Sequence, residues 1–339
     1  MITGLFDKEE RLEELRESGD HLVKLAEVVD WEGFRAVLVK VHEKERKANS
    51  GRKPHDVVLM FRIEVLRSLY NLSDEAMEYQ IKDRLSFMRF LGLGFGERVP
   101  DAKSIWLFRE RLREAGLIGE VFVEFERQLV ESGFAARKGQ IVDAAIVEVP
   151  VQRNRREVNE AIKEGRGNPE SWEEAKARQK DVEARWMRKD GRNYFGYKNH
   201  VEVDAKHKLI RRWEVTSARV HDGQVFEELL DEGNTSREVW ADAAYASKER
   251  EERMKEGKWR THIQRKGNRH RALSEREKRG NKTRARVRAR IEHVFGAMRK
   301  RMGQTLLRCV GQARARVKIG LRNLAYNMDR LRTLTLQAA

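Results

Sequence analysis

Three acidic residues lie in stretches of sequence that otherwise do not favour an acid. Asp143 is inside the apolar run Ile141–Val147, and Asp242 is inside the similar run Glu238–Tyr245. Glu292 is the one acid between Lys278 and Lys318 in an otherwise basic stretch. An ionised carboxylate among apolar residues is costly unless a cation, hydrogen bonds or a metal compensates it. Three such groups brought together would repel one another unless a divalent cation neutralised them.

The chemistry of such a site follows from its oxygen ligands. Carboxylate oxygens select hard cations, so we expect Mg²⁺, replaceable by Mn²⁺, and two ions. Ions of this kind activate a water or a 3′-hydroxyl and stabilise the leaving oxygen in a displacement at phosphorus. The structural alternatives are a strand-end cap or salt bridge for each Asp and an ordinary i,i+4 pair with Arg288 for Glu292. At about 100° per residue, Arg288, Glu292 and Arg299 share one helix face within about 60°.

The charge of the chain is concentrated near its C-terminal end. The 339 residues carry a formal net charge of +16. From Arg253 to Arg332 there are 26 Lys and Arg against 5 Asp and Glu, which leaves the remaining chain slightly acidic. A basic segment on a near-neutral body is typical of a protein that binds nucleic acid, although it also fits a solvated basic surface.

The composition excludes several classes of protein. A single cysteine, Cys309, excludes a disulfide framework and a four-cysteine zinc site, and it favours a reducing compartment. No apolar run approaches 18 residues, and the acidic N-terminus has no hydrophobic segment. We therefore expect neither secretion nor a membrane.

The periodicity of apolar residues changes along the chain and predicts the elements that must position the acids. Residues 6–45 and 56–132 have helical spacing, with Asp56 and Ser73 as N-caps. After the strand that carries Asp143, residues 152–189 look helical or irregular, and residues 194–204 and 209–218 form a hairpin. A helix at 222–230, strands at 238–245 and 261–264, and helices from about 281 follow.

Eight segments, in order along nearly the whole chain, resemble the DDE transposases of bacterial insertion sequences, in the group of insertion sequence 5. The segments are residues 85–93, 100–106, 140–144, 195–200, 218–223, 240–245, 288–295 and 318–327. The resemblance implies that Asp143, Asp242 and Glu292 are the catalytic and metal-binding acids. In the family signature around the glutamate, Arg288 matches, whereas Ala285 stands in place of a Tyr and Arg299 in place of a Lys. The missing Tyr puts a contact with the DNA end in doubt.

The resemblance also implies an α/β fold with a ribonuclease-H-like mixed sheet, preceded by an all-helical N-terminal domain. We expect a helical arm at 1–50, a helical DNA-binding or dimerisation domain at 51–136 and a catalytic domain at 137–339. An insertion at about 152–190 interrupts the catalytic domain, whose C-terminus is basic and helical. The side chains expected to contact DNA are Arg288, Arg299, Lys300, Arg301, Arg52 and Lys53. His200 and His221 are expected near the site, with a structural hydrogen bond as the alternative role of each.

The function implied is binding of double-stranded DNA at terminal inverted repeats, metal-dependent cleavage and joining of the 3′-hydroxyl to target DNA. A homodimer or larger assembly on DNA, in the bacterial cytoplasm near the nucleoid, goes with that function. Two alternatives remain open from the residues. One is a non-catalytic DNA-binding repressor of its own element, and the other is a nuclease on the same fold.

Overall fold

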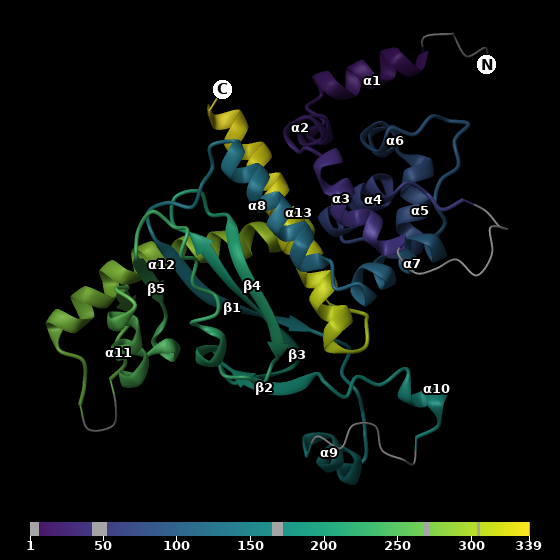
Figure 1. The fold of residues 1–339 in the computed structure, drawn as a ribbon. Helices are drawn as coiled ribbons and strands as arrows, with labels where there is room; N and C mark the ends of the chain where they lie inside the picture. The colour runs from purple at the N-terminus through teal and green to yellow at the C-terminus, as the bar shows by residue number, and fades with distance from the viewer. Residues whose placement is uncertain (1–6, 43–52, 165–171, 268–270, 304–305, 339) are drawn as a thin grey trace. The chain divides into compact units, whose positions relative to one another are not determined.

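The computed structural model describes residues 7–42, 53–164, 172–267, 271–303 and 306–338. Two compact units account for the chain, as Figure 1 lays out by element. One unit comprises the residues up to Gly133 together with Gly320–Ala339, and the other comprises Phe134–Ile319. No described helix is long and apolar enough to cross a membrane.

The described part of the first unit is helical, as expected from the sequence. Its elements are α1 (Asp7–Glu17), α2 (His21–Val28), η1 (Glu32–Phe34), α3 (Arg35–Leu38), η2 (Val39–His42), α4 (Val57–Tyr70), α5 (Asp74–Asp83), α6 (Leu85–Leu91), α7 (Ala102–Glu114) and α8 (Ile118–Glu131). The predicted N-caps are confirmed, because Asp56 accepts from the backbone of Val58 and Leu59 and Ser73 accepts from Ala76. These bonds satisfy N–H groups that the first turn of a helix leaves unpaired.

A buried ionic network joins three helices of this unit. Arg109 on α7 donates to Glu64 on α4 at 2.8 Å and to Asp74 on α5 at 2.6 Å. Arg67 donates to the same Glu64 at 2.8 Å, and the Glu64 side chain is fully buried. Removing one partner would leave an uncompensated buried charge, so the network fixes how α4, α5 and α7 pack.

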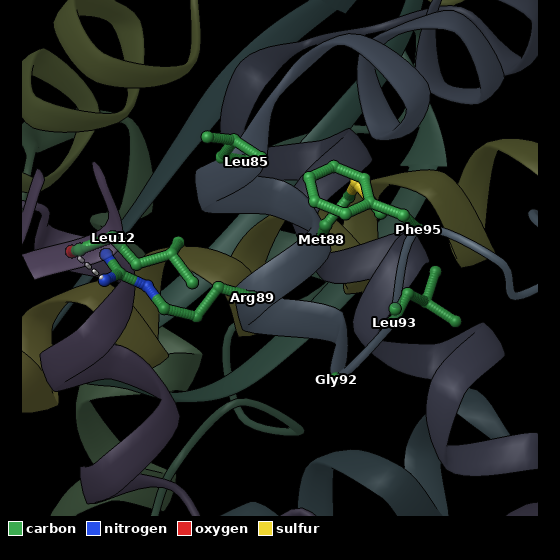
Figure 2. A pocket seen from close by; sticks show the side chains of 8 residues that line it. Leu12, Leu85, Met88, Arg89, Gly92, Leu93 and Phe95 are labelled. Carbon is green, nitrogen blue, oxygen red and sulfur yellow. Dashed lines mark hydrogen bonds between the residues drawn. The ribbon is translucent and has the colours of Figure 1, made fainter. Parts of the chain in front are cut away.

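The helical unit also holds a pocket of about 270 Å³ near α1 and α6, shown in Figure 2. Its lining is mostly apolar and includes Leu12, Met88 and Phe95. Arg89 crosses its wall and donates to the carbonyl of Leu12 at 2.7 Å. No acid lines this pocket, so it lacks the groups that the sequence predicts for catalysis.

The second unit contains a six-stranded mixed sheet. Its strands are β1 (Gln140–Glu148), β2 (Arg185–Lys189), β3 (Arg192–Asp204), β4 (Ile210–Ser217), β5 (Glu238–Ala241) and β6 (Arg260–Ile263). The order is β2-β3-β1-β5-β6, with β4 also pairing with β3. β1 pairs antiparallel with β3 and parallel with β5, and β6 is parallel to β5.

Helices and short turns complete this unit. They are α9 (Arg156–Lys163), α10 (Glu174–Ala177), η3 (Asp222–Val225), η4 (Ala243–Tyr245), α11 (Lys248–Glu256), α12 (Glu275–Met302) and the start of α13 (Gln312–Ala338). The long α12 packs against β1 and β5 (Figure 1). Val142 of β1 belongs to a separate core cluster with Phe226 and Tyr245. Because successive side chains of a strand point to opposite faces, Val142 and Asp143 lie on different faces of the sheet.

Three sequence predictions in this unit differ from the structure. Residues 185–189, which the sequence suggests to be helical or irregular, form strand β2 because the turn Asp190-Gly191 folds them back onto β3. Residues 222–230 form only the short 3₁₀ turn η3 before irregular chain, rather than a helix. The strand expected at 238–245 ends at Ala241, because Asp242 caps the turn η4.

Gly196 marks the point where β3 passes the end of β1. Its φ is +155°, and a Cβ there would lie 2.2 Å from the carbonyl oxygen of Val147. No other residue fits without moving one of the two strands. The glycine therefore permits the close approach from which the β2–β3 hairpin continues beyond β1.

Candidate active site

Asp143 lies on β1, and Asp242 directly follows the neighbouring parallel strand β5. Ile141 of β1 is level with Trp240 of β5, so the register continued by two residues brings Asp143 level with Asp242. Asp143 accepts from the backbone N–H of Ala144 at 2.8 Å, and Asp242 accepts from that of Ala244 at 2.7 Å. One oxygen of each carboxylate is thus held by a backbone N–H, which orients both groups.

Arg288 links the third acid, Glu292, to Asp143. Glu292 lies on α12, one turn after Arg288. Arg288 donates from Nη1 to Oδ2 of Asp143 at 2.9 Å and from Nη2 to Oε1 of Glu292 at 2.9 Å. The structural alternative predicted for Glu292, an i,i+4 pair with Arg288, is therefore present, and the same guanidinium also extends to the strand.

The electrostatics of Asp143 are unusual for an aspartate. Burial raises its pKa to about 6, and the negative charge of Asp242 acts in the same direction. The backbone bond from Ala144, Arg288 and Lys189 oppose this increase in pKa without cancelling it. The positive charge near Asp143 is therefore too small to offset the cost of burying its ionised carboxylate.

A divalent cation needs several oxygen ligands close together. Among the residues that the structure describes, no three His, Cys, Asp or Glu side chains form a cluster that could hold a metal ion. Arg288 stands between Asp143 and Glu292, and both acids are bound to it. The side chains nevertheless have the right chemistry for Mg²⁺, because Asp143 and Asp242 are neighbouring carboxylates with hard oxygen ligands. A cation would also stabilise the ionised form of Asp143, which burial disfavours.

The two histidines occupy different surroundings from the acids. His200 pairs with Ala144, the neighbour of Asp143, so its side chain is on the opposite face of the sheet. It is fully buried, with Nε2 2.8 Å from Oγ1 of Thr216, and burial lowers its pKa to about 4. His221 is exposed, and its Nδ1 accepts from the backbone of Gly223 at 3.2 Å as a cap of η3.

Apart from Arg288, the described basic residues expected to contact DNA lie in two places. Arg299, Lys300 and Arg301 are exposed in the last turn of α12, ten residues or fewer beyond Glu292. Lys53 is exposed just before α4 in the helical unit. Arg52 lies outside the described residues.

Sequence reasoning missed several residues around the acids. Lys189 lies close enough to act on the pKa of Asp143, although it belongs to a segment without a strand signal apart from its Asp-Gly turn. Lys198 donates to Asp222 at 2.7 Å in a partly buried ion pair on the face that holds His200. The hydroxyl of the buried Tyr245 has no hydrogen-bond partner among the described residues, and burial and nearby carboxylates raise its pKa. Nothing in the sequence distinguishes this Tyr from one that merely packs.

The chain was compared with known families and solved structures. The family described as "Transposase DDE domain" matches residues 135–328, and "Transposase domain (DUF772)" matches residues 10–111. A cryo-EM structure described as a piggyBac transposase synaptic complex with hairpin DNA is similar at a TM-score of 0.47 and 13% identity. That similarity covers 91% of this chain and 73% of the other.

The family match coincides with the part of the chain that carries the site. Residues 135–328 contain β1, β5 and α12, and hence all three acids and Arg288. Since the matched region is more than half of the sequence, the chain belongs to the DDE transposase family.

Proposed function

We propose that this transposase binds the ends of an insertion sequence, hydrolyses phosphodiester bonds there and joins the freed 3′-hydroxyls to target DNA. The element would resemble those of the insertion sequence 5 group, and the sheet with its flanking helices would follow the ribonuclease-H-like plan. The observation that supports this proposal is the convergence of Asp143 and Glu292 on Arg288, with Asp242 directly after the strand next to that of Asp143.

Asp143, Asp242 and Glu292 would hold the divalent cations, Mg²⁺ or in its place Mn²⁺, and we expect two. When bound, the ions supply an activated attacking oxygen and neutralise charge that develops at the leaving oxygen. The backbone bonds from Ala144 and Ala244 hold the two aspartates ready as ligands. The demand of Asp143 for positive charge, visible in its raised pKa, is what cation binding would satisfy.

Arg288 has two roles in this proposal. Without a cation it neutralises Asp143 and Glu292 and so keeps α12 against β1. With the acids held by cations, its guanidinium would be free to bind the phosphate of the bound strand through charge-assisted hydrogen bonds. Arg299, Lys300 and Arg301 would bind the DNA backbone further along.

The helical parts would supply recognition and assembly. We propose that residues 51–136, including Arg52 and Lys53, read the terminal inverted repeats or mediate dimerisation. The helices within 1–50 would support pairing of two chains on DNA, since two ends must be brought together. The same proposal places the protein in the bacterial cytoplasm near the nucleoid.

The test uses the full chain and DNA from either side of its gene, where short inverted repeats mark the ends. With Mg²⁺ we expect cutting at the repeat and joining to a second DNA, and neither reaction with EDTA. Binding without cutting would instead indicate a repressor, and cutting without joining a nuclease. Light scattering with and without end DNA measures the assembly, and an active complex with one chain on two ends would contradict the dimer.

A further inference from the structure

The β2–β3 hairpin extends past the rest of the sheet. β1 pairs with β3 only as far as Gly196, whereas β2 pairs with β3 from Gly196 back to Arg192. β2 is an edge strand, with no second strand neighbour among the described residues. Asp190 and Gly191 both have positive φ, of 50° and 77°, as a two-residue hairpin turn requires. The turn fixes which side chains the projecting part presents.

The hairpin presents a large aromatic side chain on the same face as the candidate active site. Trp186 pairs with Phe195, and Phe195 shares its face with Val201, the partner of Asp143. Trp186 is 50% exposed, whereas its cross-strand partner Phe195 is buried. The two ring centroids are 5.2 Å apart, so Phe195 supports the indole from one side and leaves much of it open to solvent.

Three cations lie on the same hairpin as this tryptophan: Arg188 shares its face, and Lys189 and Arg192 pair with each other beside the turn. Arg188, Lys189 and Arg192 are exposed, and none has a carboxylate partner among the described residues. Two arginines earlier in the insertion differ in this respect, because Arg156 and Arg178 pair with Glu160 and Glu174. Lys189 in addition lies near enough to Asp143 to lower the pKa of that carboxyl group. The cationic end of the hairpin is therefore close to the candidate site.

A hairpin that carries an exposed indole together with cations that have no carboxylate partner among the described residues suits one class of ligand. Single-stranded nucleic acid offers an open base face for stacking and phosphates for the cations. The bases of an intact duplex are already stacked on one another, so a duplex would use the cations and leave the indole unused.

We propose that the β2–β3 hairpin binds an unpaired stretch of DNA beside Asp143, with a base stacked on Trp186 and phosphates on Arg188, Lys189 and Arg192. This inference rests on the proposed function, since it requires a DNA strand to lie at the acids. It gives the insertion a role as the element that holds unpaired nucleotides next to the reacting phosphate.

The test is equilibrium binding with EDTA present, so that no cutting occurs. The probes are a blunt duplex and the same duplex with a short unpaired 3′ extension, both labelled for fluorescence anisotropy. Trp186→Ala should weaken binding of the extended probe by about 5- to 100-fold, the usual range for one stacked base, and leave the blunt duplex within about twofold. Trp186→Phe, which keeps a ring, should lose less.

Matched variants separate stacking from charge and from folding. Trp106→Ala removes another half-exposed tryptophan, on α7, and should leave the preference for the extension unchanged. Joint replacement of Arg188, Lys189 and Arg192 by Ala should reduce the salt dependence of extended-probe binding by a slope of about 2. Equal losses on both probes with Trp186→Ala, or no loss on either, would overturn the inference.

The outcomes also separate this inference from the proposed function. A wild-type protein that prefers the extended probe yet never cuts DNA would contradict the function and leave the hairpin assignment intact. A protein that cuts and joins DNA, with Trp186→Ala indistinguishable from wild type on both probes, would overturn the hairpin assignment alone.

Discussion

The guanidinium of Arg288 lies 2.9 Å from the carboxylate of Asp143, although 145 residues separate them in the sequence. Since the same guanidinium binds Glu292, one side chain joins the strand acid to the helix acid. The contact explains how α12 brings Glu292 to the interior strand β1, where Asp143 is level with Asp242. The arrangement leads to five predictions.

The first prediction concerns the cost of keeping Asp143 ionised in the protein without metal. A pKa of about 6, above the ordinary 3.8, means that the folded state favours the protonated form. The stability that this provides is complete below pH 3.8 and is lost as the pH rises through 6, by about 3 kcal/mol. Asp143→Asn should therefore gain about 3 kcal/mol relative to wild type between pH 4 and pH 7.5 in EDTA, measured by urea unfolding.

Mg²⁺ provides the complement to this experiment. At pH 7.5 it should raise the melting temperature of the wild type and leave that of Asp143→Asn unchanged, because a ligand of the folded state stabilises it. Equal effects of Mg²⁺ on both proteins would contradict a cation at Asp143.

His200 should have the opposite pH dependence. Burial lowers its pKa from 6.5 to about 4, so the folded state favours the neutral ring. That stability is present above pH 6.5 and is lost as the pH falls toward 4, by about 3 kcal/mol. His200→Gln, which can still bond Thr216, should remove this acid sensitivity in urea unfolding between pH 7 and pH 4. A variant as acid-sensitive as wild type would show that His200 does not titrate this way.

Gly196 and Gly191 form a matched pair within the β2–β3 hairpin. Gly196→Ala should destabilise the protein by several kcal/mol, because its Cβ would meet the Val147 carbonyl oxygen at 2.2 Å. Gly191→Ala has open space around it and a φ of 77°, so it should cost only about 1–2 kcal/mol of left-handed strain. Chemical unfolding measures both, and similar losses would show that no close approach exists at Gly196.

DNA affinity should depend on the last turn of α12. Replacing Arg299, Lys300 and Arg301 by Ala should weaken binding to any sequence and lower the salt slope by about 0.9 for each phosphate that the variant no longer neutralises. Arg11 and Arg16 on α1 are equally exposed but pair with Glu14 and Glu13, so their replacement serves as the control. An unchanged slope in the triple variant would remove this turn from the DNA interface.

The sequence predicted those parts of the fold that local periodicity determines. The strand at Asp143, the hairpin 194–204 with 209–218 and the strand at 261–264 lie within a few residues of β1, β3, β4 and β6. β2 could not be predicted in this way, because Arg185, Arg188 and Lys189 interrupt the alternation of its apolar residues and the strand forms only through the Asp-Gly turn.

The same limit applies to the candidate site. Apolar surroundings identified Asp143 and Asp242, and charge contrast identified Glu292. Helical spacing correctly predicted the pair of Arg288 with Glu292. The bond from Arg288 to Asp143 and the influence of Lys189 depend on tertiary packing of α12 and of the hairpin, which no local pattern in the sequence encodes.

The central claim is that Asp143, Asp242 and Glu292 together carry out cleavage and joining of DNA. The most direct measurement is Mg²⁺-dependent cutting and joining of end DNA by Asp143→Asn, Asp242→Asn and Glu292→Gln, with binding measured in parallel. Each change keeps the shape of the side chain and removes its charge, so each variant should bind DNA and lose both reactions. Glu275→Gln makes the same change at an exposed position in the first turn of α12 and should remain active. Robust joining by any of the three variants would contradict the account.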